Sequence, residues 1–201
     1  MRNDFLKEIE NGVIKLSRKK GILFSVVNCE RLLFNYVSFQ KKNNWGDHRI
    51  LQDSIDMIYQ YLINENVFDS DDFSKQLEMI DSATPHTEAF PGILTSFALD
   101  ACTSIHGTLL FILDNDVERV MDIVSYAYDT VDMFIQEKEN INSNDKQIEN
   151  KIWNDSFMKN AIRSQHELLF RISKLENDTI TDEIINGLKI EQRIIDLTIL
   201  N

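Results

Sequence analysis

Apolar residues recur at every third or fourth position along most of the chain, which is the period of one face of an α-helix. No stretch shows the sustained alternation of apolar and polar residues that indicates a half-buried strand. The pattern predicts about eight helices, at residues 3–19, 22–42, 48–64, 70–83, 92–113, 116–136, 148–175 and 181–200. Because short connections favour antiparallel neighbours, we expect an all-α fold, a single-domain antiparallel bundle over residues 1–201.

The composition supports long helices, since the chain has 201 residues but only 6 Gly and 2 Pro. Both prolines fall in one expected loop, Thr84–Gly92, and a very apolar helix follows it. That helix, Gly92–Leu113, has about the length of a membrane span. Asp100 near its centre would cost about 2.5–3.5 kcal/mol in a bilayer. We therefore expect a buried core helix and no association with a membrane.

The chain is acidic: 21 Lys and Arg stand against 33 Asp and Glu, a formal net charge of −12. A phosphate backbone would be repelled by this average field, so nucleic-acid binding is not expected. The densest basic cluster, Ser17–Gly21, is better placed to close the first helix, with Gly21 as its stop. A negative balance of this size favours solubility and can steer a basic partner.

The N-terminus and the cysteines indicate a cytoplasmic protein. The first residues, MRNDFLKEIENG, lack the apolar segment of a signal peptide. Cys29 and Cys102 lie in apolar helical patterns, so two free thiols are expected. Cys102 and His106 share a helix face as i,i+4 neighbours, but zinc requires further ligands that the chain hardly offers. Because the common nucleotide-binding and hydrolase motifs are missing as well, we expect neither a bound metal nor a cofactor.

Two carboxylates stand beside apolar or small residues. Glu30 is flanked at helical spacing by apolar residues, whereas Asn28, Arg31 and Asn35 mark the polar face of the same helix. Asp100 lies on a row of small and hydroxyl-bearing residues that would let another helix approach and donate a hydrogen bond. A buried carboxylate needs a partner or stays protonated. We therefore expect a hydrogen-bond partner for each carboxylate, and we expect that Glu30 and Arg31 do not both point to solvent.

Three short segments resemble one known family in their order and spacing. They are CERLLFNY (Cys29–Tyr36), GD (Gly46 and Asp47) and LDAC (Leu99–Cys102). This combination is similar to the bacterial domain of unknown function 416 family over about residues 21–174, apart from Phe34, where that family often has a proline. The resemblance implies an all-helical fold and supplies no activity.

The resemblance also implies that Glu30, Arg31, Tyr36 and Asp100 form one site or one buried network. Buried ion pairs in helix bundles commonly fix packing, and we prefer that structural role for the four side chains. The alternative is a small-ligand or enzyme site that they line together.

The sixth predicted helix has an apolar row and, opposite to it, an acidic row with an aromatic residue at its edge. The candidate partner-binding residues of that row are Glu118, Asp122, Tyr126, Asp129 and Asp132. Such a row serves solubility, or it docks a basic protein. We expect a non-enzymatic protein-binding module, such as an immunity protein or an inhibitor of a basic toxin. The sequence leaves homo-oligomerisation open.

Overall fold

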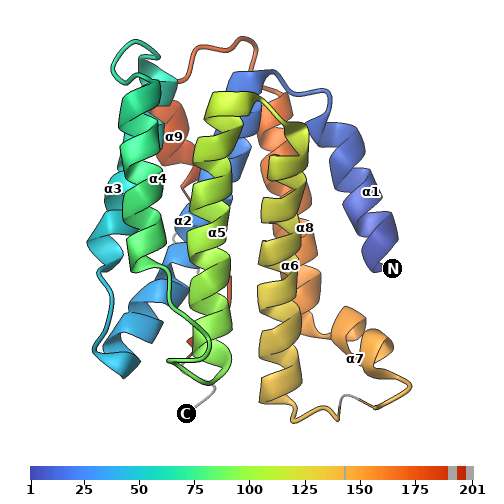
Figure 1. Ribbon diagram of the computed structural model, residues 1–201. Helices are drawn as coiled ribbons and strands as arrows, with labels where there is room; N and C mark the ends of the chain where they lie inside the picture. The colour runs from blue at the N-terminus through green and yellow to red at the C-terminus, as the bar shows by residue number, and fades with distance from the viewer. Residues whose placement is uncertain (143, 190–193, 198–201) are drawn as a thin grey trace.

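The computed structural model describes residues 1–142, 144–189 and 194–197, and all regular structure in these residues is helical, which confirms the all-α prediction. In chain order the described helices are α1 (Arg2–Val13), α2 (Arg18–Asn43), α3 (His48–Ile63), α4 (Ser70–Ala83), α5 (Ile93–Asp114), α6 (Val117–Lys138), α7 (Ile148–Asn154), α8 (Ser156–Ser173) and α9 (Asp182–Leu188). Helices α5 and α6 stand side by side in front of α2 and α8, with α3 and α4 at one edge and α1 at the other (Figure 1).

Helix α2 lies at the centre of the bundle, and 15 of its 26 residues are buried. It packs against α3, α5, α6 and α8. One apolar core gathers side chains from α1 through α9. Among the described helices, α5 alone is long and apolar enough to cross a membrane, a test that the core helix of a soluble protein also passes.

The first helix is shorter than predicted, and the second begins earlier. Helix α1 ends at Val13, and Ser17 caps α2 because its side chain accepts a hydrogen bond from the Lys20 amide at 3.4 Å. The prediction that Gly21 stops a helix is therefore wrong, since Gly21 lies inside α2. A Cβ at this position would stand 3.0 Å from Cε1 of Phe111. The glycine permits the close approach of α2 and α5.

The helices near the C-terminus are also divided differently from the prediction. The expected helix 148–175 is interrupted at Asp155, whose backbone is extended and whose side chain accepts a hydrogen bond from the Phe157 amide at 2.7 Å. Because aspartate is a strong N-cap, this local interaction separates α7 from α8. Helix α9 ends at Leu188 rather than near Leu200. Residues 190–193 and 198–200 of the expected last helix lie outside the described residues.

The turn before α3 depends on Gly46, whose φ is +88° and whose Cβ, if present, would lie 2.4 Å from Oη of Tyr36. We expect Gly46→Ala to lower the free energy of unfolding by about 2–4 kcal/mol, because left-handed strain and the clash act together. Urea denaturation measures the change. Gly187→Ala is the matched control, since no atom of the described residues lies within 4 Å of its added Cβ, and it should change stability by less than about 1 kcal/mol. Equal losses at the two positions would contradict the prediction.

Candidate functional site

The four side chains that the family resemblance groups together lie in three separate places. Glu30 and Arg31 face α3, α8 and the end of α9, while Tyr36 reaches the end of α4. Asp100 bonds across to α6. Tyr36 and Asp100 lie on different sides of α5. Cys102 of α5 stands near Tyr36, whereas Asp100 of the same helix bonds to α6. The described contacts do not join the four residues into one network.

Glu30 is held by side chains from two other segments. Its Oε2 accepts a hydrogen bond from Oη of Tyr59 at 2.8 Å, and its Oε1 lies 3.4 Å from Nζ of Lys189. Lys189 also stands over the ring of Tyr59, 4.7 Å from its centroid. Burial and the charge of Glu30 raise the pKa of Tyr59, so the phenol stays protonated and donates. The expectation that Glu30 has a hydrogen-bond partner is confirmed.

The sequence marks Asn28, Arg31 and Asn35 as a polar face of α2, and the structure buries all three. Asn28 is 0%, Arg31 5% and Asn35 1% exposed. Helix α8 covers the start of this row, where Nε2 of Gln165 donates to Oδ1 of Asn28 at 2.6 Å. Because Arg31 is buried, the expectation that Glu30 and Arg31 do not both point to solvent is confirmed.

One edge of the Arg31 guanidinium is buried and makes no hydrogen bond to the described residues. Within the described part of the chain, its Nε and Nη2 have no acceptor, and Nδ2 of Asn35, one helical turn further on, has none either. Burial lowers the pKa of Arg31 to about 10; the nearby Tyr59 opposes this shift, and the positive charge of Arg171 adds to it. The group is still charged at neutral pH. Helix α2 therefore holds a desolvated cation with two unused donors.

Tyr36 has a packing role at the other end of α2. The residue is fully buried, and its Oη donates to the carbonyl oxygen of Ala83 at 2.6 Å. Burial raises the pKa of Tyr36 to about 12, so the phenol remains a neutral donor. This hydrogen bond ties α2 to the end of α4, beside the Gly46 turn.

Asp100 is half-buried between α5 and α6. Its Oδ2 accepts a hydrogen bond from Oγ1 of Thr130 at 2.7 Å, which confirms the expectation of a partner. Burial raises the pKa of Asp100 to about 7, the hydrogen bond from Thr130 opposes the shift, and the charge of Asp129 adds to it. Asp100 therefore gains and loses its proton near neutral pH.

The five residues predicted to bind a partner remain along the outer side of α6, but they differ in exposure. Two are exposed and three are half-buried: Glu118 and Asp122, then Tyr126, Asp129 and Asp132. Asp129 is paired with Arg2 of α1, whose Nη2 lies 2.8 Å from its Oδ1. Asp132 accepts a hydrogen bond from Gln136 at 2.5 Å. Glu118 and Asp122 are therefore the exposed carboxylates of the row for which the described residues supply no cationic partner.

Asp100 adjoins this row across the contact between α5 and α6. Burial and the charges of Asp122 and Asp100 raise the pKa of Tyr126. The charge of Asp129 acts on Asp100 in turn. We call Asp100, Asp122, Tyr126 and Asp129 the acidic seam. Sequence reasoning placed Asp100 and the α6 row at different sites, because no spacing rule relates residues on two helices.

Cys102 and His106 do not face a common partner. Cys102 is buried, and burial raises the pKa of its thiol to about 12 while a hydrogen bond with Thr84 opposes the shift. Nε2 of His106 lies 3.5 Å from Oδ1 of Asp81 on α4. No group of three or more His, Cys, Asp or Glu side chains within the described ranges could hold a metal ion. The thiol has the surroundings of an inert core cysteine.

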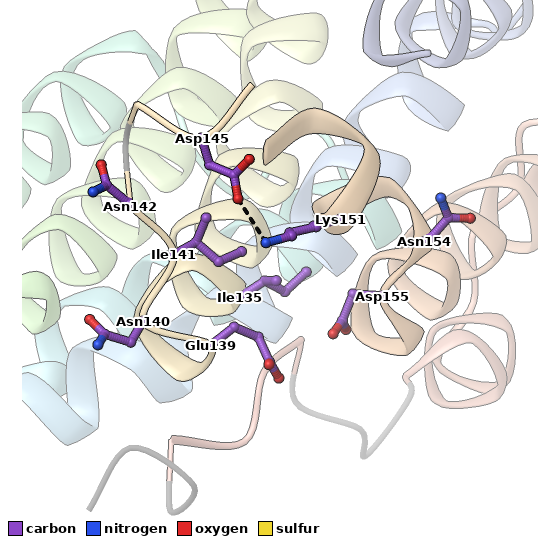
Figure 2. A pocket seen from close by; sticks show the side chains of 9 residues that line it. All are labelled: Ile135, Glu139, Asn140, Ile141, Asn142, Asp145, Lys151, Asn154 and Asp155. Atoms are coloured by element: carbon purple, nitrogen blue, oxygen red, sulfur yellow. Dashed lines mark hydrogen bonds and ion pairs between the residues drawn. The ribbon is translucent and has the colours of Figure 1, made fainter. Parts of the chain in front are cut away.

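An open pocket lies between the C-terminal end of α6 and α7 (Figure 2). Ile135 and Ile141 supply apolar side chains, and Asp145, Lys151 and Asp155 stand among the polar groups. Nζ of Lys151 lies 2.7 Å from Oδ2 of Asp145 across this pocket. Asp155 caps α8 and lies 3.2 Å from Nζ of Lys138. These charged side chains already pair with one another. We therefore interpret their role as stabilising the turn between α6 and α7, and not as binding a ligand.

Sequence reasoning missed Tyr59 and Gln165 as buried polar partners of α2. Both lie in amphipathic helices where their spacing looks like that of ordinary residues, and no sequence signal singles them out. Asn35 carries a weak signal, since it stands four residues after Arg31 on the same row. Its burial depends on what packs against α2, which the spacing does not reveal.

Comparisons with known proteins agree with this fold. A family described as "Protein of unknown function (DUF416)" matches residues 8–198, a longer stretch than the segments that suggested the resemblance. A crystal structure of a DUF416 family protein from Shewanella baltica OS155 superposes with a TM-score of 0.79 over 90% of both chains, at 23% sequence identity. At that identity the likeness supports the shared fold.

Curated bacterial relatives are similarly distant. The Escherichia coli (strain K12) protein described as "Uncharacterized protein YjaG" is 22% identical over 182 residues, covering 89% of this chain and 88% of that protein. A Haemophilus influenzae protein described as uncharacterized is 24% identical over 138 residues, covering 68% of this chain and 67% of its own length.

Proposed function

Since this chain belongs to the family described as proteins of unknown function (DUF416), its role has to be inferred from its own geometry, and we propose a protein-binding module that docks a basic partner on the acidic seam. In its specific form, the proposal is an immunity protein or an inhibitor of a basic toxin in the cytoplasm. The protein would act by covering the basic surface of its partner, without a catalytic step of its own.

One observation carries the proposal: Asp100 is a half-buried carboxylate without a cationic partner among the described residues. Its one described hydrogen bond comes from the neutral hydroxyl of Thr130. Arg2 is occupied by Asp129, and Arg119 lies 3.3 Å from Asp114. A lysine or arginine from a partner would supply the missing positive charge and would gain from the reduced screening at this position.

The surroundings of the seam suit a protein contact. Tyr126 is a half-buried aromatic residue in its middle, and aromatic residues are common anchors of interfaces. At the turn where α6 begins, Leu113 is 40% and Val117 is 36% exposed. Glu118 follows directly and extends the negative charge to this turn. Apolar and charged groups thus lie near one another, as a mixed interface requires.

The proposal is tested with a photo-crosslinking residue at position 126 in cells of the native species, and with the same residue at position 78 as a control. A basic protein captured from position 126 is then purified and titrated. We expect the Glu118→Lys/Asp122→Lys variant to bind at least about tenfold more weakly, because two favourable charges become repulsive. Binding to the unaltered protein should weaken as salt rises.

The matched variant Asp53→Lys/Glu78→Lys makes the same change in net charge at exposed positions of α3 and α4. It should retain affinity within about twofold, because a remote surface charge acts mainly through the screened average field. Equal losses in the two variants would show that the seam has no special role. Capture of one and the same protein from both crosslinking positions would also count against the proposal.

A further inference from the structure

The proposed function makes no use of the buried guanidinium edge of Arg31 that lacks acceptors. Nε and Nη2 are the two donors on one side of the guanidinium, and neither has an acceptor within the described residues. This pair is the fork that binds both oxygens of a carboxylate or two oxygens of a phosphate. Asn35 adds an unused Nδ2 donor one turn away on the same buried row.

We propose that Arg31 and Asn35 form a binding site for a small carboxylate. The carboxylate would accept hydrogen bonds from Nε and Nη2 of Arg31, and Nδ2 of Asn35 would bind a further acceptor of the same ligand. A desolvated cation with unpaired donors costs free energy, and such a ligand removes that cost by supplying both charge and acceptors.

The neighbouring polar side chains do not fill this role, because they are engaged elsewhere. Glu30 is bound to Tyr59 and Lys189. Nε2 of Gln165 donates to Asn28. Glu167 and Arg171 of α8 act on Arg31 through opposite charges, and the effect of Arg171 is the larger of the two.

These charges favour a singly charged ligand. Near Arg31 the negative charges of Glu30 and Glu167 stand against the positive charge of Arg171, and the chain as a whole has a net charge of −12. A doubly charged phosphate would meet more repulsion than a carboxylate, whereas either has the two oxygens that the fork requires. The burial of Arg31 favours a small molecule over a folded partner, whose surface could not reach the guanidinium.

The end of α9 covers the site through contacts on two sides. Arg171 of α8 donates to the carbonyl oxygen of Gly187, and Lys189 pairs with Glu30 of α2. Arg31 lies near both contacts, since the charges of Arg171 and Glu30 both act on it. Ile185 and Leu188 anchor α9 in the core, whereas the contacts of Lys189 at its end are polar and can break locally at a smaller cost. Lys189→Ala removes one contact and should speed ligand exchange.

Acetate is the probe, and the full chain labelled with ¹⁵N is the sample. The Nε–Hε signal of Arg31 is assigned by its loss in Arg31→Lys. When acetate replaces chloride at constant ionic strength, we expect that signal to shift to saturation. Backbone amides of α2 then report affinity in the variants. Arg31→Lys should weaken binding at least about tenfold, because lysine cannot form the two parallel hydrogen bonds.

Arg163 of α8 is the internal control, because its side chain is 69% exposed and its signal should show no saturable change. Arg31 signals that do not move, or equal acetate affinity in Arg31→Lys, would overturn the proposal. Tighter binding of phosphate than of acetate would overturn the choice of a carboxylate. Should Arg31→Lys fail to fold, Asn35→Ala replaces it, and unchanged affinity in that folded variant would overturn the site. None of these results depends on binding at the acidic seam.

Discussion

Arg31→Met is expected to raise the free energy of unfolding by about 1–4 kcal/mol, because an apolar side chain of similar length replaces a desolvated charge. Arg31 is 5% exposed, and two of its donors have no acceptor within the described residues. Glu30 would not be left unpaired, since Tyr59 and Lys189 still bind it. Urea denaturation at neutral pH and low salt, without added carboxylate, measures the change.

Arg18→Met is the matched control for this experiment. The guanidinium of Arg18 donates to the carbonyl oxygen of Ile112 and, at 3.1 Å, to Oη of Tyr61. Removing it should lower the free energy of unfolding by about 1–3 kcal/mol, since its acceptors lose their donor. The two substitutions are thus expected to change the free energy of unfolding in opposite directions. A loss of about 3–5 kcal/mol in Arg31→Met would instead identify Arg31 as a stabilising member of a buried ion pair.

Asp100→Asn is expected to stabilise the protein at pH 8 by about 2–4 kcal/mol, and the gain should shrink as the pH falls toward 4. Burial raises the pKa of Asp100 from 3.8 to about 7. The folded protein therefore keeps a proton that the unfolded chain releases in this interval. The contribution of Asp100 is fully present below about pH 4 and is lost as the pH rises through about 7. Asparagine cannot ionise, yet it still accepts the hydrogen bond from Thr130.

Asp122→Asn provides the control, because Asp122 is an exposed carboxylate of the same seam. Its effect should stay below about 0.5 kcal/mol at both pH values. Chemical denaturation of the two variants and the unaltered protein at pH 4.5 and 8 gives the comparison. A lower stability of Asp100→Asn than of the unaltered protein at pH 8 would mean that nearby groups already stabilise the ionised carboxylate. Asp100 would then have no need of a cation from a partner.

Local signals were sufficient to predict most helices of this chain. The all-α class followed from the period of the apolar residues, and Asp47 caps α3 by accepting from the Arg49 amide at 3.0 Å. The same kind of signal was overlooked at Ser17 and Asp155, whose side chains begin α2 and α8. These N-caps act within three residues, so the information was present in the sequence although the apolar period ran across it.

The candidate sites depended much more on tertiary packing. Asn28, Arg31 and Asn35 have the spacing of one polar helix face, and this spacing does not say whether the face is solvated or covered. They are buried because α2 is surrounded on several sides, with α8 and the end of α9 close to this row. Since periodicity reports which residues share a face and not what covers that face, no reading of α2 alone could place Arg31 in the interior.

The acidic row shows the same division between sequence and tertiary structure. The sequence by itself determined that Glu118, Asp122, Asp129 and Asp132 follow one side of a helix, because helical geometry relates residues three and four positions apart. Only the tertiary structure decided that Arg2 neutralises Asp129 and that Asp100 of α5 joins the row. Those relations connect residues far apart in the chain, and they exist because burial of the apolar faces of α1, α5 and α6 brings their polar edges together.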